Sequence, residues 1–279
     1  MLEQRPLAPR ILRIFGFGFL ALAITALAGG IWGALLVANL RTGPAVPWAV
    51  AVMAPLLWLM WNYLAEKGWP RSTSDVRRRY LRANPGPLAT YVWSFAAGGL
   101  AVVALAGYWI VFSQLVKMPP NVIPGLTGYP PLTLGLVVLM ASLIAPFIEE
   151  AAFRGYFQVV LERDFRAPLA VVITSIFFAV AHLNHGIVWP KILVYFPVGV
   201  TFGATAYLTN SYLPAIPPHM FGDLVFFLFV WPHDAARKQV WDSGPDSWFW
   251  IHVAQSVVFT VFALWAFMQL AKRPRLSGT

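Results

Sequence analysis

Long apolar segments recur along the whole chain and constrain its fold more than any other feature. A helix needs about 20 consecutive apolar residues to cross the hydrocarbon core of a bilayer. Of the 279 residues, 59% are hydrophobic and 11% are charged. The apolar runs are too long for membrane strands and do not alternate, so the sequence predicts an all-α, polytopic membrane bundle of about eight transmembrane helices. The expected spans are residues 14–39, 45–65, 88–115, 132–156, 168–184, 190–209, 214–231 and 248–271.

The basic residues outside these spans are distributed unevenly. Lys and Arg mark the cytoplasmic side of membrane proteins. An even number of spans puts both termini on one side, and that side receives fourteen basic residues against five on the other. Orientation therefore explains the net charge of +9 better than binding of nucleic acid does. We expect an integral membrane protein with both termini in the cytoplasm. The composition, rich in Ala, Arg and Trp, suggests a bacterial cytoplasmic membrane.

Two adjacent carboxylates lie inside the fourth apolar segment. An ionised group in hydrocarbon costs on the order of 3 kcal/mol by insertion scales, so membranes retain such groups when they are paired or functional. Glu150 and Arg154 are one helical turn apart and can pair on one face. A pair that only specifies helix packing would leave Glu149, about 100° around the helix, unexplained. The pattern predicts a site in which Arg154 neutralises Glu150 while Glu149 stays free for proton transfer.

A histidine follows on the fifth span at a matching depth. The connection between the two spans lies near residues 163–168, with Pro168 as a first-turn residue. Glu149 lies about 16 residues before this connection and His182 about 17 after it, so at ~1.5 Å per residue an antiparallel pair reaches the same height. A lone histidine in a span is usually a structural hydrogen-bonding group, but this register predicts an imidazole opposite a carboxylate.

The third polar segment lies at the start of the seventh span. Asp223 follows His219 by four residues, so the two share one helical face. Pro214, Pro217 and Pro218 precede them, which predicts that a helix begins there. We expect all three polar segments to face one cavity that opens toward the cytoplasmic side. The chain has no cysteine, which excludes disulfides and thiolate chemistry.

The order of these motifs resembles a known family. Glu-Glu-x-x-x-Arg, then Phe-x-x-x-His, then His-x-x-x-Asp on separate spans is similar to the CPBP family of intramembrane endopeptidases. That family includes the CAAX prenyl-protein endopeptidases and bacterial relatives linked to bacteriocin processing and immunity. The resemblance also takes in Gly155, Phe196 and Gly199. It divides the chain into N-terminal spans with a basic cytoplasmic loop (1–131), a catalytic core (132–231), and a loop with the C-terminal span (232–279).

The resemblance implies a role for each matched position. Glu149 would be the general base that, with His182, activates water for attack on a peptide carbonyl. Glu150 and Arg154 would hold that arrangement in place. His219 and the residue at position 223 would stabilise the oxyanion. The implied substrate is a peptide or protein in the membrane, and nothing in the sequence identifies it further.

Two questions stay open at this stage. Asparagine at position 223 could donate to an oxyanion, whereas ionised Asp223 would repel it, so Asp223 must be protonated, orient His219, or help hold a metal. Glu149, His182 and His219 would also form a two-histidine, one-carboxylate zinc set with an open position for water. Glu150 would then be the base. The metal-free mechanism needs the same residues, so the sequence does not decide between them.

Two other classes of function have to be weighed. Carboxylates and histidines inside spans also describe a proton-coupled carrier. Such carriers often have interrupted helices in both halves of the chain, but here the intramembrane ionisable residues lie only in the second half. A non-proteolytic member of the same family could act as a membrane immunity or binding protein. Because every motif position is filled, the endopeptidase hypothesis is favoured.

Overall fold

The computed structural model of the chain describes residues 6–64, 69–75, 81–118, 128–185 and 188–277. Within these ranges all regular elements are helices, so the all-α prediction is confirmed. They are α1 (Leu7–Thr42), α2 (Trp48–Leu64), η1 (Arg71–Thr73), α4 (Leu88–Leu115), α5 (Pro131–Glu149), η2 (Glu150–Phe157), α6 (Gln158–Asp164), α7 (Ala167–Ala181), η3 (His182–His185), α8 (Trp189–Thr209), η4 (Leu213–Ala215), α9 (Ile216–Val225), η5 (Phe226–Val230), η6 (Trp231–Ala236), α10 (Val240–Ser243) and α11 (Ser247–Ala271).

The expected spans all have helical counterparts. In the described part of the chain, six helices are long and apolar enough to cross a membrane, and two shorter apolar helices, α2 and α7, occupy the other expected positions. The fourth span differs from expectation, because α5, η2 and α6 form one continuous helix that runs to Asp164 rather than ending near residue 156. The chain is therefore an integral membrane protein built as a helical bundle.

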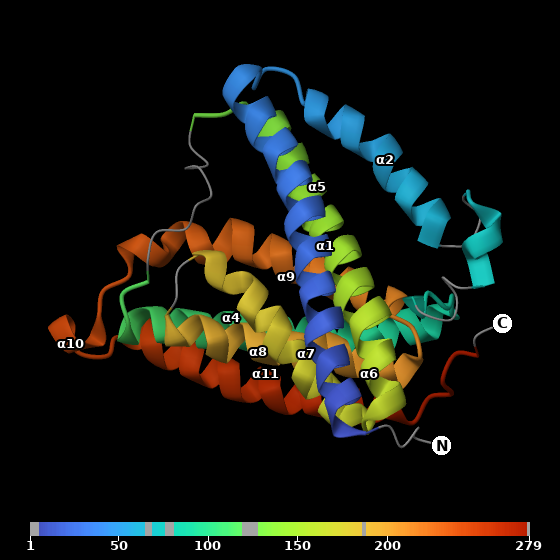
Figure 1. The fold of residues 1–279 in the computed structure, drawn as a ribbon. Helices are drawn as coiled ribbons and strands as arrows, with labels where there is room; N and C mark the ends of the chain where they lie inside the picture. Colours follow the sequence, from blue (N-terminus) through green and yellow to red (C-terminus); the bar gives the residue numbers. More distant parts are fainter. Residues whose placement is uncertain (1–5, 65–68, 76–80, 119–127, 186–187, 278–279) are drawn as a thin grey trace.

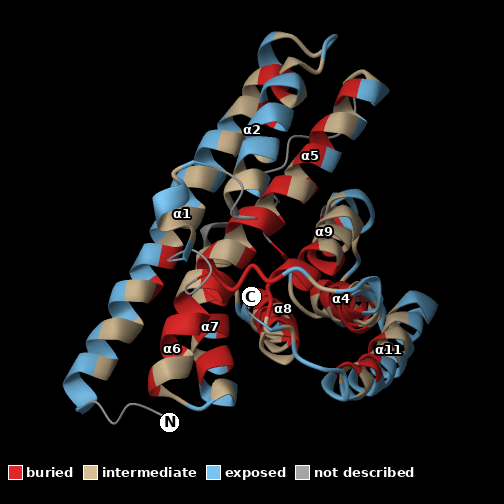
Figure 2. Ribbon diagram, turned by 90° about the vertical axis from the view of Figure 1, so that its right-hand side faces the viewer, coloured by how far each residue is buried: buried red, intermediate tan, exposed pale blue. Residues whose placement is uncertain are grey.

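The helices form two groups that cross each other. In Figure 1, α4, α8 and α11 run side by side, while α1 and α5 lie together and cross them steeply. Figure 2 shows that buried residues gather where η2, α6, α7, α8 and α4 meet. The outer faces of α1, α2 and α11 carry exposed apolar side chains such as Leu27, Trp58 and Phe262. Those faces are suited to contact with lipid.

Polar contacts tie the connections together at the end of the bundle that holds both termini. Arg10 donates to the Asp164 carbonyl at 2.8 Å, and Arg82 pairs with Glu162. Asn84 donates to the Asn210 carbonyl at 2.7 Å. The Asn210 side chain in turn donates to the Leu276 carbonyl at 2.8 Å. These contacts fix the helix ends that set the depth of the polar motifs.

A close backbone contact between helices lies between α7 and α8, at Gly199. A Cβ atom at this position would lie 2.8 Å from Ser175 Cα, closer than real Cβ contacts allow. Small residues let membrane helices approach in this way. Gly199→Ala should therefore lower the free energy of unfolding by about 1–3 kcal/mol through overpacking, measured as a shifted thermal transition in detergent. Gly33→Ala in α1 is the control, because no atom lies within 4 Å of the added Cβ. Equal transitions for the two variants would contradict the close packing.

Candidate active site

The paired glutamates lie where the fourth span changes its helical geometry. Pro146 inside α5 cannot donate a backbone hydrogen bond, and one turn later the chain enters the π-helical segment Glu150–Phe157. Short π-helical segments occur frequently at functional sites. This one points Glu150 and Arg154 into the core, where their side chains are 0% and 1% exposed.

A network of buried charged side chains lies on the side of the site that is closed to solvent. Arg154 pairs with Glu150 at 3.1 Å and donates to the Gly199 carbonyl at 3.1 Å. Its guanidinium carbon also lies 4.4 Å from the centre of the Phe178 ring. Nδ1 of His219 lies 2.8 Å from the Glu150 carboxylate. Since a carboxylate only accepts, His219 donates from Nδ1. The Glu150 carboxylate therefore contacts both Arg154 and His219.

Glu149 faces two imidazoles without a direct hydrogen bond to either. Its Oε2 lies 3.8 Å from Nε2 of His182 and 3.7 Å from Nε2 of His219. That oxygen is buried and has no hydrogen-bond partner in the described part of the chain. His182 Nδ1 lies 2.8 Å from the Phe178 carbonyl, which can only accept, so Nδ1 carries the proton. In the neutral ring Nε2 is therefore an acceptor that faces an acceptor carboxylate.

His219 is held in orientation from three sides. Its ring stacks on Phe202 with centroids 4.5 Å apart and planes 17° apart. Nδ1 bonds Glu150, which leaves Nε2 directed toward the Asp223 carboxylate at 3.9 Å. Oδ2 of Asp223 is buried and has no hydrogen-bond partner among the described residues. Three carboxylate oxygens, on Glu149, Glu150 and Asp223, are thus left without hydrogen bonds around one imidazole.

The six predicted positions come together but differ in their access. Glu150, Arg154 and His219 are 0%, 1% and 6% exposed. The side chains on the other side are partly open: Glu149, His182 and Asp223 are 18%, 19% and 22% exposed. Reaction partners can therefore reach the second set directly, and of the first set only His219 also lines a cavity at the site. The first set can hold and orient the second.

A small cavity lies against the open side of the site. Its volume is about 60 Å³, and His182, His219 and Asp223 are among the residues that line it. About two water molecules would fill this volume. It does not accommodate a peptide, so a substrate has to approach from the exposed side.

Sequence reasoning missed two aromatic residues of the site, both on α8. Tyr195 stacks on His182 with centroids 4.3 Å apart, and Phe202 stacks on His219. Tyr195, Gly199 and Phe202 are spaced by four and three residues, so they share one helical face. Gly199 belonged to the family resemblance, and the spacing around it was the signal that could have identified its neighbours.

The arrangement does not by itself provide a metal centre. Across the described ranges, no group of three His, Asp or Glu side chains is arranged to hold a metal ion. The zinc set of Glu149, His182 and His219 therefore stays a prediction. The donor types do suit zinc, and each imidazole has its Nδ1 occupied by a hydrogen bond.

The fold and the polar cluster define a helical membrane protein with an internal site made of carboxylates and imidazoles. Residues 131–225 match a family model described as Type II CAAX prenyl endopeptidase Rce1-like. This part of the chain is similar to that family, and the predicted resemblance is confirmed. No match to the chain was found among curated proteins or among solved structures. The Rce1-like family points to intramembrane protease activity on a peptide substrate in a lipid environment.

Proposed function

We propose that the protein is a metal-independent intramembrane endopeptidase that hydrolyses a peptide bond of a membrane-associated substrate. The observation that carries the proposal is the gap between Glu149 Oε2 and His182 Nε2. Two acceptors 3.8 Å apart, one of them buried without a hydrogen bond, can share one donor placed between them. Polar groups separated by more than about 3.5 Å are commonly bridged by water. One water can donate a hydrogen bond to each acceptor, and this water is the proposed nucleophile.

In the first step Glu149 acts as the general base. It accepts a proton from the water as the water oxygen attacks the scissile carbonyl carbon. His182 Nε2 accepts the second water hydrogen bond and aims the oxygen lone pair. The C=O double bond becomes a C–O⁻ single bond in a tetrahedral intermediate. Glu149 is suited to this role because Glu150, not Glu149, is occupied by Arg154.

His219 is the proposed donor to the oxyanion. Its Nδ1–H is committed to Glu150, so only Nε2 remains to donate, and donation from Nε2 requires a doubly protonated ring. The neighbouring carboxylates of Glu149 and Glu150 supply negative charge around such a cation. In the second step the proton on Glu149 passes to the amide nitrogen as the C–N bond breaks. The products are a carboxylic acid and an amine.

The choice of test substrates follows from the family description and from the position of the site within membrane helices. The matching family is described as Type II CAAX prenyl endopeptidase Rce1-like, so a farnesylated CAAX peptide is the first probe, alongside unmodified peptides with an apolar segment. A proton-coupled carrier or a non-proteolytic binding protein is not favoured by the family match. Either of these would leave all the probes uncleaved.

Glu149→Gln should abolish cleavage while the protein keeps its fold. An amide cannot accept the proton from water, and loss of a general base costs typically 10²–10⁴-fold in rate. The measurement is cleavage of the probe peptides in proteoliposomes by mass spectrometry. Asp242→Asn in α10 is the control, because it neutralises an exposed carboxylate away from the site. Wild-type turnover by Glu149→Gln would refute the base assignment.

Substitutions at position 223 test how the oxyanion is stabilised. If Asp223 donates to the oxyanion as a protonated acid, Asp223→Asn should retain activity within about tenfold, since the amide supplies the same donor. Asp223→Leu should lose it, because leucine has no donor. The measurement is the initial rate of cleavage of one membrane-embedded peptide by the wild type and the two variants. A folded but inactive Asp223→Asn protein would show instead that the anion is needed, to orient His219 or to hold a metal.

A zinc-dependent form of the mechanism has one observation in its favour. Both imidazoles present Nε2 to Glu149 while Nδ1 bonds a carbonyl or carboxylate, as in metal-bound histidines. Glu149, His182 and His219 would hold the ion, which would supply a Lewis acid that activates water. Glu150 would have to serve as the base in spite of its two partners.

The zinc content of the purified protein distinguishes the metal-independent mechanism from the zinc-dependent one. The metal-independent proposal expects less than about 0.1 equivalent of zinc in purified protein and full activity after chelation. The zinc form expects about one equivalent, lost in His182→Ala. Stoichiometric zinc that disappears with His182 would overturn the metal-independent mechanism even before any activity is measured.

We also propose that both termini face the cytoplasm, because the polar contacts at their end of the bundle join the basic connections. The absence of native cysteine allows single-cysteine reporters. Ser72→Cys and Ser277→Cys should react with a membrane-impermeant maleimide only after the membrane is opened, and Ser243→Cys in intact cells. All three positions are exposed. The reverse labelling pattern would place the site toward the other side of the membrane.

A further inference from the structure

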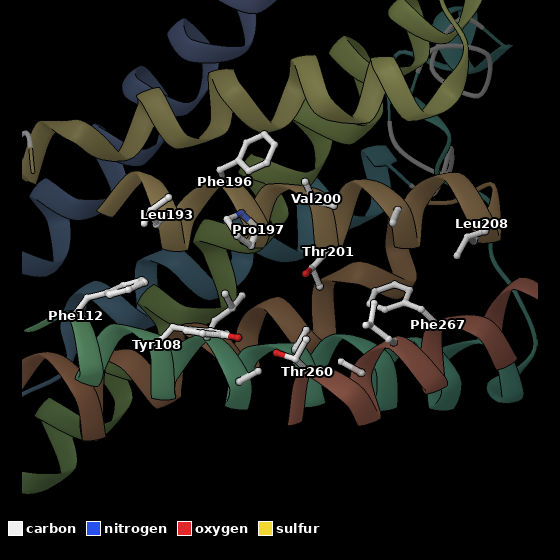
Figure 3. Close-up of a pocket in the computed structure, with 16 residues that line it drawn as sticks. Tyr108, Phe112, Leu193, Phe196, Pro197, Val200, Thr201, Leu208, Thr260 and Phe267 are labelled. Carbon is white, nitrogen blue, oxygen red and sulfur yellow. The ribbon is translucent and has the colours of Figure 1, made fainter. Parts of the chain in front are cut away.

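A second and much larger cavity lies on the other side of α8 from the active site. Its volume is about 730 Å³, and it forms an open groove bordered by α4, α8 and α11 (Figure 3). On α8 the residues that line it include Phe196, Val200 and Ala204, whereas Tyr195 and Phe202 face the small cavity at the active site. The two cavities therefore lie on different faces of α8, and Leu105 of α4 lines both of them. None of the six proposed active-site positions lines the large cavity.

Small side chains create this cavity. Both α8 and α11 pack on α4 but contact each other much less. Ala101, Ala104, Ala204 and Ala263 line the space left between them. The cavity follows α8 from Leu193 to Leu208, about 22 Å at 1.5 Å per residue. It therefore runs along most of the depth of a hydrocarbon core of about 30 Å.

The chemistry of the lining selects an apolar and slender occupant. Nearly all of the lining is hydrocarbon, with Phe112, Phe196 and Phe267 among the larger side chains. Its side-chain polar atoms come from Tyr108, Thr201 and Thr260. A long apolar groove without charge suits an extended alkyl chain better than a peptide, whose backbone groups would lack partners there.

The end of the groove near Leu208 is capped by a basic tail. Residues after α11 fold back onto the end of α8, where the backbone N–H of Leu276 donates to the Thr209 carbonyl at 2.9 Å. The Arg275 guanidinium lies 4.6 Å from the centre of the Tyr207 ring, next to Leu208. Arg273 lies over Trp93 at 5.4 Å. Both arginines are exposed, and neither has an acidic partner in the part of the chain that the structure describes.

We propose that this groove is a binding site for an anionic glycerophospholipid. One acyl chain lies between α4, α8 and α11, and the phosphate is held by Arg273 and Arg275. A guanidinium can bind a phosphate through two parallel hydrogen bonds, and the basic tail lies where the headgroup of a chain in the groove would emerge. The bound chain fills the space behind α8 and so supports the helix that carries Tyr195 and Phe202. The site goes beyond the proposed peptidase function and does not depend on it.

The headgroup half of the site is tested by native mass spectrometry of the purified protein with added phosphatidylglycerol and phosphatidylcholine. Each arginine should contribute about fivefold to binding of the anionic lipid. The double variant Arg273→Gln/Arg275→Gln should therefore bind phosphatidylglycerol about 25-fold more weakly and phosphatidylcholine nearly as well as wild type. Arg166→Gln, an exposed arginine at the same end of the bundle, is the control. Unchanged binding in the double variant, or an equal loss in the control, would overturn the proposal.

The acyl half of the site is tested by filling the groove. Ala204→Phe should weaken binding of both lipids at least tenfold, and Val200→Trp provides a second, independent filling substitution. Ile192→Phe on the outer face of α8 adds a similar volume at an exposed position and should leave binding unchanged. Glycerol phosphate is added as a competitor to separate a lipid from a free phosphate. Retained lipid in both folded filling variants, or displacement by millimolar glycerol phosphate, would contradict an acyl-chain site.

Discussion

The buried ion pair between Glu150 and Arg154 is the interaction on which the rest of the site depends. Both side chains are almost fully buried, and an isolated charge there would be costly. Removing one partner of such a pair typically destabilises a protein by about 3–5 kcal/mol. Each member of the pair also makes a second contact. Glu150 fixes the tautomer of His219, and Arg154 joins the fourth span to α8 through the Gly199 carbonyl.

This network gives the two adjacent glutamates different surroundings. Glu150 is fully enclosed and contacts Arg154 and His219, while Glu149 is partly exposed and faces two imidazoles without a hydrogen bond to either. The π-helical geometry after Glu149 contributes to this separation, because it redirects the following side chains within one continuous helix. The same span therefore supplies both the structural anchor and the proposed base.

Spacing in the sequence was sufficient for the coarse geometry. Apolar runs predicted the helices, and counting from the connection at Pro168 placed Glu149 and His182 at one depth, where they lie 3.8 Å apart. Spacing could not reveal the bond from His219 to Glu150, because it joins residues 69 positions apart through the rotation of two helices. The π-helical segment was also missed, since its backbone has no distinctive composition beyond Pro146. Stacking by Tyr195 and the lipid groove depend on how α8 packs, which periodicity alone does not determine.

The central claim is that Glu149 and His182 act on one water. Two groups that activate the same nucleophile lose their effect together, so their contributions are not additive. The direct measurement is a double-mutant cycle in kcat/KM with Glu149→Gln, His182→Ala and the combined protein, on a single cleavable membrane peptide. The account predicts that the combined protein is no slower than the slower single variant, within about threefold. Independent losses that multiply in the combined protein would contradict it.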